Sequence, residues 1–339
     1  MRMTAFKEIN GIKSKIKHHG LDYDYWSYRM KWRLAPRVHF VTRFPTHLDI
    51  ELTNACNLRC VMCPHGFPTP EFKKTLGFMD EKLLINLIDE GAEKGLCSIK
   101  FNWRGEALLH KKLAAKAVSY AKSKGIVEVA LNTNGLLLDE EMSAALIESG
   151  LDLIIFSIDG NSKATYEQVR KGGDFDRMLS NVYGFLKMRE EKKRTRDMQV
   201  RVQMVKMDHN IHEVQDFLNR WRPLVDSISF QDYTNRGEQD ERLKGSHVST
   251  GRLPCPQIWQ RMVVAWDGKV IMCCRDWDSK NLLGIIDYDS GKNVEYFWHG
   301  EELKRIRKFH LEKRLNEVAA CKDCQYKESY NWKRNGNKA

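Results

Sequence analysis

Long apolar runs are missing from this sequence. Its longest apolar stretches, such as LDLIIF, are far shorter than the roughly 20 residues that cross a bilayer, which excludes a membrane span. The amino-terminal MRMTAFKEINGIKSK also lacks the apolar core of a secretory signal peptide. No repeat of fixed period and no low-complexity tract is found, which excludes the solenoid and fibrous classes. We therefore expect a globular, cytoplasmic protein.

An excess of positive charge is missing from the middle of the chain. The formal net charge is +11, but residues 1–45 carry ten Lys/Arg against three Asp/Glu, and residues 301–339 carry eleven against six, so the middle holds about −1. This distribution argues against a nucleic-acid groove through the core. Two solvated ends explain it most simply. The alternative is a docking surface for an acidic partner, such as a flavodoxin or ferredoxin reductant or a phosphorylated substrate.

Strand and helix patterns alternate between residues 46 and 233. In the first predicted helix, Leu84, Leu87 and Ile88 share one face and Gly95 follows the last turn. Six strands that alternate with helices imply a parallel sheet covered by helices, an α/β fold. The strands are predicted at 46–53, 98–104, 127–135, 151–160, 199–207 and 227–233, and the helices at 80–95, 110–125, 139–150, 175–193 and 211–221.

The flanking segments have a different character. The lead-in is basic and aromatic, with one helix predicted around DYDYWSYRMKWRLA, and residues 234–254 are polar and turn-rich, as in a linker. Beyond it the sequence predicts a hairpin, MVVAWDGKVIMCC, turning at Asp267–Gly268, then a basic helix around EELKRIRKFHLEKR and the closing CKDC. We therefore divide the chain into a lead-in (1–45), an αβ domain (46–240) and a cysteine-rich domain (241–339).

Polar motifs fall at the carboxyl ends of the predicted strands. Cys56 follows the first strand and RGE follows the second, while NTNG ends the third and SIDG ends the fourth. Parallel sheets with helical crossovers place their chemistry at these strand ends. The coincidence of motif and strand end predicts a single site there.

Three cysteines, Cys56, Cys60 and Cys63, lie within eight residues as C-x3-C-x2-C. Disulfides are rare in the cytosol, so metal or cluster ligation is the leading use of such closely spaced thiols. A cubane [4Fe-4S] cluster is ordinarily held by four thiolates, so three leave one iron with an exchangeable position. The alternative is a zinc knuckle with His65 as the fourth ligand.

The spacing C-x3-C-x2-C after the first strand of an αβ-repeating chain resembles the radical S-adenosylmethionine (radical SAM) superfamily. The resemblance implies a partial (β/α)6 TIM-type barrel over the αβ domain. It also implies that the open iron chelates the amino and carboxylate groups of SAM. Reductive cleavage of SAM would then give a 5′-deoxyadenosyl radical, which abstracts a hydrogen atom from the substrate, with a flavodoxin or ferredoxin as reductant.

The resemblance also implies further SAM-binding residues. In WRGE, Gly105 and Glu106 resemble a motif that meets the SAM amino group, although Arg104 replaces a glycine and so removes the freedom of positive φ. Met62 stands where an aromatic residue often lies beside adenine. The remaining candidates lie on later strands and on the helix that follows, near the SAM ribose, methionine end or carboxylate: Asn132, Thr133, Asn134, Ser157, Asp159 and Arg170.

Each of these candidates has a structural alternative. Asn134 with the following glycine suits a turn, Ser157 and Asp159 suit a cap, and Arg170 taken alone suits a surface charge. Their order after the three cysteines favours the SAM-binding interpretation.

The carboxy-terminal cysteines resemble those of the SPASM domain, an auxiliary-cluster domain of many radical SAM enzymes. Cys255 is followed by twelve residues, Gly268, four residues and Cys273, and Cys321-x2-Cys324 lies downstream. No cysteine follows that could hold a second auxiliary cluster. The resemblance thus implies one auxiliary [4Fe-4S] cluster ligated by Cys255, Cys273, Cys321 and Cys324, either an electron relay or a structural staple. Structural zinc is the alternative.

Two cysteines remain outside these sets. Cys97 is expected to be a small buried apolar residue. Cys274 competes with Cys273 for the cluster, and the G-x4-C spacing selects Cys273. Cys274 is then a candidate hydrogen-atom donor to a substrate radical, as an epimerase would need.

The substrate class is inferred indirectly. A single auxiliary cluster and the absence of a leading peptide-recognition domain of about 80 residues favour a small molecule. We expect a sugar, aminocyclitol or other polyol that undergoes dehydrogenation or epimerisation. The alternatives are radical modification of a ribosomally made peptide, and a non-catalytic iron–sulfur or zinc protein.

Overall fold

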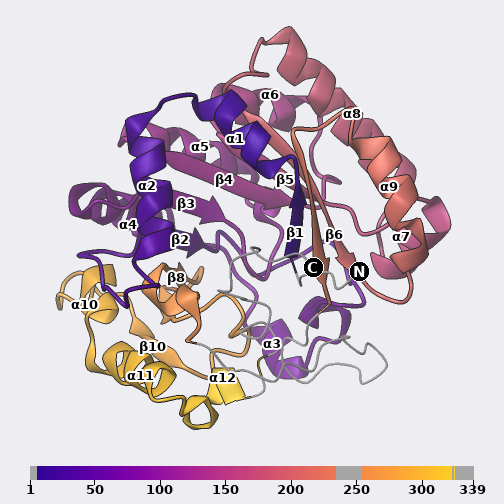
Figure 1. Cartoon of the computed structure of the whole chain (residues 1–339). Helices are drawn as coiled ribbons and strands as arrows, with labels where there is room; N and C mark the ends of the chain where they lie inside the picture. Colours follow the sequence, from indigo (N-terminus) through magenta and orange to yellow (C-terminus); the bar gives the residue numbers. More distant parts are fainter. Residues whose placement is uncertain (1–5, 234–253, 323, 325–339) are drawn as a thin grey trace, which may run out of the picture.

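The computed structural model describes residues 6–233, 254–322 and 324, so the predicted linker 234–254 lies outside the described residues except for Pro254. A ten-stranded sheet has the order β1-β7-β6-β5-β4-β3-β2-β8-β9-β10 (Figure 1). The six predicted strands are confirmed as β2 to β7, all paired in parallel. The strands are β1 (Phe6–Ile9), β2 (His47–Ile50), β3 (Ser98–Phe101), β4 (Glu128–Thr133), β5 (Leu153–Ser157), β6 (Gln199–Lys206), β7 (Ser227–Asp232), β8 (Arg261–Val264), β9 (Lys269–Ile271) and β10 (Leu282–Ile285).

Helices alternate with the parallel strands and lie around the outside of the curved sheet (Figure 1). Local signals fix their ends: Asp80 accepts hydrogen bonds from the first backbone N–H groups of α4, and Gly95 closes that helix at φ 88°. The helices are α1 (Gly11–His19), α2 (Tyr23–Leu34), α3 (Pro70–Lys74), α4 (Glu81–Lys94), α5 (Lys111–Ser123), α6 (Glu140–Glu148), α7 (Lys163–Val169), α8 (Phe175–Glu191), α9 (Val214–Trp221), α10 (Val294–Trp298), α11 (Glu301–Leu311) and α12 (Ala319–Lys322).

The sheet extends past the six predicted strands at both edges. At one edge β1 pairs antiparallel with β7, and at the other β8 pairs in parallel with β2. The predicted hairpin is confirmed as β8 and β9, with Gly268 at φ 79° in its turn. The sequence did not predict that the lead-in and the hairpin would join the barrel sheet. An open parallel sheet leaves unpaired backbone groups on its outer strands, and these added strands satisfy them.

Side chains alternate between the two faces of each barrel strand. In β2, Leu48 and Ile50 belong to the hydrophobic core that packs under the helices, whereas His47 and Asp49 are buried polar residues of the opposite face. The interior of the barrel, called the lumen below, therefore contains buried polar groups beside small apolar clusters that are separate from the main core. The polar groups thus face the inside of the barrel, while the outer layer supplies the stabilising core.

The lead-in helices cover the amino-terminal end of the barrel strands. Trp32 of α2 stacks edge-on against His47, the first residue of β2, and its carbonyl accepts a 2.6 Å hydrogen bond from Gln260. Ser14 of α1 donates a 3.1 Å hydrogen bond to Gln199, the first residue of β6. The lumen is thus closed at this end, and the carboxyl ends of the strands remain as its other end.

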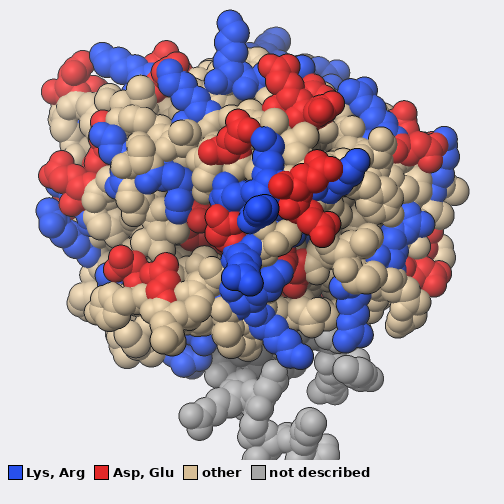
Figure 2. Space-filling model, turned by 90° about the horizontal axis from the view of Figure 1, so that it is seen from above, with Lys and Arg blue, Asp and Glu red and all other residues tan. Residues whose placement is uncertain are grey.

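Charges of both signs share the surface. On the face seen in Figure 2, Lys and Arg side chains are interspersed with Asp and Glu, so this face carries no field of one sign. Among the described residues, every helix is too short or too polar to cross a bilayer.

Candidate active site at the carboxyl ends of the barrel strands

The three-cysteine loop leaves the carboxyl end of β2 and is fixed to the end of α7. The backbone N–H groups of Arg59 and Val61 donate 2.9 Å hydrogen bonds to the carbonyls of Lys171 and Val169. The Arg59 guanidinium also donates to the Cys56 carbonyl at 2.8 Å. These bonds hold the loop in place, and all three of its cysteines are free thiols.

Burial raises the pKa of two of these thiols. It raises the pKa of Cys60 to about 12, although the nearby Arg170 guanidinium acts in the opposite direction. Burial also raises the pKa of Cys56, and Glu106 adds to this effect. A coordinating metal deprotonates its thiol ligands outright, so these sites become thiolates only on cluster binding.

The Glu106 side chain is hydrogen-bonded to two other predicted SAM-binding residues. Its carboxylate accepts a 2.8 Å hydrogen bond from the Thr133 hydroxyl and another of 2.8 Å from the Asn134 backbone N–H. Burial raises the pKa of Glu106, whereas these hydrogen bonds act to lower it. The ends of β3 and β4 are therefore joined at one carboxylate, beside the loop that contains Cys56.

Gly105 is required by a close approach of backbones. A Cβ atom at this position would overlap the Thr53 carbonyl and lie 2.5 Å from the Ala55 carbonyl oxygen. The neighbouring Glu106 N–H donates a 2.9 Å hydrogen bond to that same Ala55 oxygen. The tight contact joins the end of β3 to the start of the cysteine loop.

Arg104 is accommodated without a positive φ angle. Its guanidinium forms a bidentate pair with Glu51 at 2.8 and 2.9 Å, and its backbone N–H donates to the same carboxylate at 3.2 Å. The side chain lies against the Trp103 ring at 4.0 Å. The replacement of a glycine here therefore adds a buried ion pair and does not strain the backbone.

Arg170 and Asp159 form a buried ion pair at 2.6 Å. The other Asp159 oxygen accepts a hydrogen bond of 2.6 Å from the Val205 N–H, and Asp159 itself has φ 57°. Arg170 Nη1 lies 3.9 Å from Cys60 Sγ. Asp159 is thus occupied in holding the guanidinium, and Arg170 is the member of this pair that faces the cysteine loop.

The other predicted SAM-binding residues lie at or near the same end of the barrel. Ser157, at the end of β5, accepts a 2.7 Å hydrogen bond from Gln203, and the Asn134 amide donates one of 2.8 Å to Asn57 of the cysteine loop. Asn132 lies near the end of β4, and its buried Oδ1 has no hydrogen-bond partner among the described residues. Met62 belongs to the hydrophobic core.

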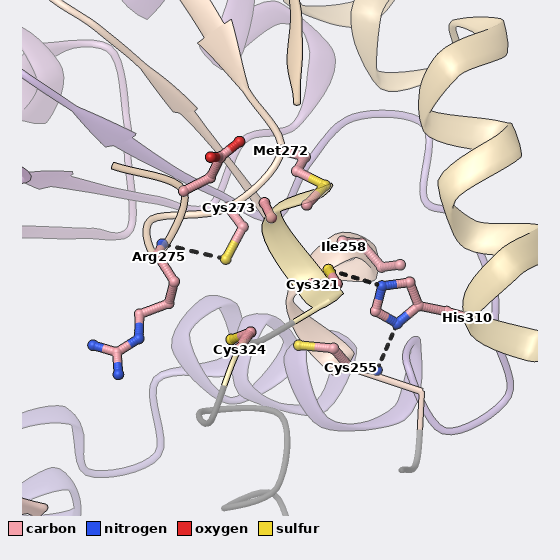
Figure 3. Close-up of a pocket in the computed structure, with 10 residues that line it drawn as sticks. Cys255, Ile258, Met272, Cys273, Arg275, His310, Cys321 and Cys324 are labelled. Atoms are coloured by element: carbon pink, nitrogen blue, oxygen red, sulfur yellow. Dashed lines mark hydrogen bonds between the residues drawn. The ribbon is translucent and has the colours of Figure 1, made fainter. Parts of the chain in front are cut away.

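Four carboxy-terminal cysteines line one cavity, and their side chains approach it from separate segments (Figure 3). Cys255 precedes β8, Cys273 follows β9, Cys321 lies in α12, and Cys324 follows that helix. All four are free thiols. A cavity walled by four thiols has the donor set that a fully ligated cubane cluster needs.

Cys274 directly follows Cys273 after β9, and both thiols donate 3.4 Å hydrogen bonds to Gln257 Oε1. Cys274 packs against Trp103, Val263 and Ala265, a group separate from the main core, and its carbonyl accepts a 3.0 Å hydrogen bond from the Trp103 indole. It is not among the residues that line the four-cysteine cavity. Val263 alternates along β8 with core residues, so this group faces the lumen.

Cys97, which the sequence assigns to packing, precedes β3 and is 9% exposed, in a cluster with Tyr25 and Tyr28 of α2. Its place at the amino-terminal end of the barrel is remote from both cysteine sites.

Sequence reasoning missed a charged group inside the lumen. Asp49, Lys100 and Arg261 come from β2, β3 and β8; Asp49 and Lys100 are register partners, and Arg261 donates to Asp49 at 2.9 Å. Burial lowers the pKa of Lys100, although Asp49 acts to raise it. The signal was available in the sequence, because charged residues alternate with apolar ones in HLDIEL and SIKF.

Neither cysteine site has the geometry of a single-ion site in the described residues. Among them, no three Cys, His, Asp or Glu side chains are close enough to hold one metal ion. A zinc ion would need its thiolates about 2.3 Å from one point, whereas a cubane presents a separate iron to each thiolate. The described geometry gives the zinc alternatives no support.

Comparisons with known proteins agree with this arrangement. A sequence model of the radical SAM superfamily matches residues 50–219, and a model of an iron–sulfur cluster-binding domain, SPASM, matches residues 255–325. A curated relative, the GTP 3′,8-cyclase of Limosilactobacillus fermentum, is 26% identical over 209 residues, 61% of this chain and 60% of that protein. The chain thus spans about 60% of the length of the first curated relatives it matches.

Solved structures share the fold at low sequence identity. BtrN in complex with AdoMet and 2-DOIA superposes with a TM-score of 0.58 at 18% identity, covering 84% of this chain and 94% of BtrN. Streptococcus suis SuiB bound to S-adenosylmethionine has a TM-score of 0.62 at 13% identity, covering 89% and 77%. The partial barrel with a carboxy-terminal cysteine-rich domain is therefore the fold of this chain. With the superfamily model matched over half its length, the chain belongs to the radical SAM superfamily and carries a SPASM domain, so that its cofactors are SAM, the [4Fe-4S] cluster that binds it, and an auxiliary iron–sulfur cluster.

Proposed function

We propose that this radical SAM enzyme abstracts a hydrogen atom from a small polar molecule in the lumen, such as a sugar, an aminocyclitol or another polyol. When bound, the cluster and SAM supply a 5′-deoxyadenosyl radical that takes the hydrogen atom. The observation that carries the proposal is the set of polar groups in the lumen, where Lys100 offers a donor and the Asn132 Oδ1 an acceptor for hydroxyl groups.

The SAM end of the site is assigned to residues of the strand ends. Cys56, Cys60 and Cys63 hold the first cluster, and the Glu106 carboxylate accepts from the SAM amino group. Arg170, oriented by its 2.6 Å pair with Asp159, binds the SAM carboxylate. The hydrogen bonds from Thr133 and Asn134 keep the Glu106 carboxylate at the strand ends, so SAM meets an acceptor that is already positioned.

Gly105 lets the end of β3, with Glu106, approach the cysteine loop. The other predicted SAM contacts lie around this point. Met62 packs beside the adenine, and Ser157 and Asn132 offer polar contacts to the ribose. Because most of these side chains are buried and already hydrogen-bonded to protein partners, little ordering is left for SAM binding to accomplish.

Lys100 is the proposed base of a dehydrogenation. After loss of a hydrogen atom from carbon, an α-hydroxyalkyl radical becomes a ketone by losing the hydroxyl proton and one electron. Lys100 takes the proton, and burial favours its neutral, proton-accepting form. The auxiliary cluster, when bound, supplies an acceptor for the electron.

Cys274 supports epimerisation as the second candidate reaction. It packs among lumen-facing residues and is not one of the residues that line the four-cysteine cavity, which suits a thiol that returns a hydrogen atom to a substrate radical. The S–H bond breaks, a C–H bond forms on the opposite face, and the resulting thiyl radical takes one electron and one proton from the reductant system. The ligands of the auxiliary cluster are then Cys255, Cys273, Cys321 and Cys324.

The comparisons leave several substrate classes to be tested. The matched structures include BtrN with 2-DOIA and SuiB with its precursor peptide SuiA, and the curated relatives are GTP 3′,8-cyclases. At 18% identity or less, the structural matches support only the fold. The closed amino-terminal end and the charged lumen favour a small polar molecule over an extended peptide.

The test begins with anaerobic reconstitution, for which two cubanes predict about eight irons per chain. SAM and dithionite are then added with carbon-deuterated sugars and aminocyclitols, with GTP and with peptides, and deuterium in 5′-deoxyadenosine is measured. Transfer from a sugar or aminocyclitol is the expected result. Absence of 5′-deoxyadenosine would overturn the radical chemistry, and transfer only from GTP or from peptides would overturn the substrate class.

A further inference from the structure

His310 lies between two of the four cysteines around the carboxy-terminal cavity (Figure 3). It belongs to α11 and is 1% exposed. The backbone N–H of Cys255 points to its Nδ1 at 3.1 Å, and its Nε2 lies 3.4 Å from Cys321 Sγ. One imidazole ring therefore joins the first and third cysteines of the predicted ligand set.

The contact with Cys255 determines the tautomer of this ring. A backbone N–H is always a donor, so Nδ1 must accept and cannot carry a proton. A neutral imidazole then carries its proton on Nε2, and the remaining contact is an N–H···S hydrogen bond toward Cys321. The direction of that bond thus follows from the geometry on the opposite side of the ring.

We propose that His310 is a positioning residue that donates a hydrogen bond to the Cys321 thiolate and raises the reduction potential of the auxiliary cluster. The proposal rests on the ligand set assigned under the proposed function. An added electron increases the negative charge on the cluster sulfurs, so a donor to sulfur stabilises the reduced form more than the oxidised form. Burial strengthens the effect because water cannot screen it.

Another donor at this site comes from the backbone. The Arg275 N–H lies 3.4 Å from Cys273 Sγ and is retained whatever the side chain at that position. His310 is a side-chain donor, which substitution can remove. A higher potential would make the auxiliary cluster a better acceptor for an electron from the substrate, as a dehydrogenation requires.

The experiment measures the auxiliary cluster alone in the full-length chain. Cys56, Cys60 and Cys63 are changed to Ser to remove the first cluster, and about four irons are expected to remain. Into this background His310→Asn and His310→Gln are introduced. Asn retains an acceptor near Nδ1 but has no donor near Nε2, and Gln presents an amide N–H near Nε2.

The reduction potential of the cluster is measured by a redox titration that is monitored by electron paramagnetic resonance. The measurement involves no catalytic turnover. His310→Asn should lower the ratio of reduced to oxidised cluster about tenfold at a fixed potential. This corresponds to a potential about 59 mV lower for a one-electron couple. The potential of His310→Gln should stay close to that of the parent. Equal potentials in the parent and His310→Asn, or equal shifts in both variants, would overturn the proposal. Absence of iron from the parent would overturn the four-cysteine site itself.

A second measurement needs no substitution of His310, in case His310→Asn fails to retain its cluster. In the same background with ¹⁵N-labelled histidine, the reduced cluster should show a weak hyperfine coupling to one nitrogen, as expected across an N–H···S bond. No coupling, or the strong coupling of a directly bound nitrogen, would contradict the proposed role. Loss of 5′-deoxyadenosine formation by the complete enzyme is a separate result, because these readouts do not depend on SAM cleavage.

Discussion

At the scale of single residues, the site depends on side chains whose partners are already in place. Glu106, Arg170 and Arg104 each have buried hydrogen-bond or ion-pair partners within the chain. Lys100 differs, because no hydrogen bond or ion pair within the described residues involves its ammonium group, and Asp49 acts on it only at longer range. Residues that position SAM should therefore tolerate little change, whereas Lys100 is available to the substrate.

Replacing Lys100 should separate SAM cleavage from product formation. Lys100→Met removes the base, so product formation should fall about 10²-fold or more, while 5′-deoxyadenosine formation without substrate should persist because Lys100 is not a SAM contact. Both products are measured by chromatography in the same reaction.

Lys100→Arg is the matched control for charge, since arginine keeps the positive charge but cannot act as a base near neutral pH. The wild-type rate should rise with pH through the lowered pKa of Lys100, because the neutral amine increases above that pKa. Equal product formation by the Arg variant and the wild type would contradict the assignment.

Gly105→Ala should impair both stability and SAM binding. The new methyl group would overlap the Thr53 carbonyl, and relieving that overlap should cost about 1–3 kcal/mol. The displaced strand end would also move Glu106. The melting temperature and equilibrium binding of SAM are the measurements.

Gly184→Ala is the matched control for Gly105→Ala, because nothing lies within 4 Å of a Cβ added at that position in α8. Alanine favours helix over glycine by about 1 kcal/mol, so this variant should be at least as stable as the wild type. Equal melting temperatures for the two variants would contradict the close approach at Gly105.

At the scale of elements, the lead-in helices close the amino-terminal end of the barrel through aromatic contacts. His19, the last residue of α1, stacks on Tyr25 of α2 with ring centroids 3.4 Å apart and planes 4° apart. Its Nε2 lies 2.9 Å from the Gln199 amide at the start of β6. The ring therefore links both lead-in helices to the sheet.

Because His19 is held between the lead-in helices and the sheet, its protonation at low pH should destabilise this packing. Burial lowers the pKa of His19 to about 4, below the value near 6.5 in the unfolded chain. Its contribution to stability is therefore complete above pH 6.5 and is lost as the pH falls toward 4. The urea midpoint of the wild type should fall between pH 7 and pH 5, and His19→Phe, which keeps the stacked ring but cannot be protonated, should fall less.

The exposed His212 provides the control for this comparison. His212→Phe should leave the pH dependence of the urea midpoint as in the wild type. The same pH dependence in His19→Phe and the wild type would show that acid acts elsewhere.

At the scale of the whole molecule, one sheet connects the two cysteine sites. β2 leads into the loop of Cys56, and its neighbour β8 is followed by β9 and Cys273. In Figure 1 the carboxy-terminal helices α10 to α12 lie beside this edge of the sheet. The spacing between the sites is thus fixed by strand pairing.

Unfolding should therefore be a single event for the barrel and the auxiliary site. We expect circular dichroism and the visible absorbance of the auxiliary cluster to change at the same denaturant concentration, measured in the chain that lacks the three cysteines of the first loop. Two separated transitions would show that the cysteine-rich segment unfolds independently of the sheet it joins.

The sequence predicted the fold class and the family where the information is local. The spacing of Cys56, Cys60 and Cys63, the six alternating strands and the cap at Gly95 all depend on neighbours in the chain, and the family resemblance is carried by such short motifs. His310 could not be found in this way. Its contact with Cys255 joins residues 55 positions apart, and only the packing of α11 creates it.

The sequence by itself determined the α/β class, the three-thiol loop at a strand end and the family, because strand and helix periods and short ligand spacings are properties of the local chain. The tertiary structure decided which side chains share the lumen, that Cys273 and not Cys274 lines the four-cysteine cavity, and that β1 and β8 join the edges of the sheet. These depend on strand register and on which edges find a partner. Register and edge pairing are settled by burial and backbone hydrogen bonding over the whole molecule, and no short segment contains that information.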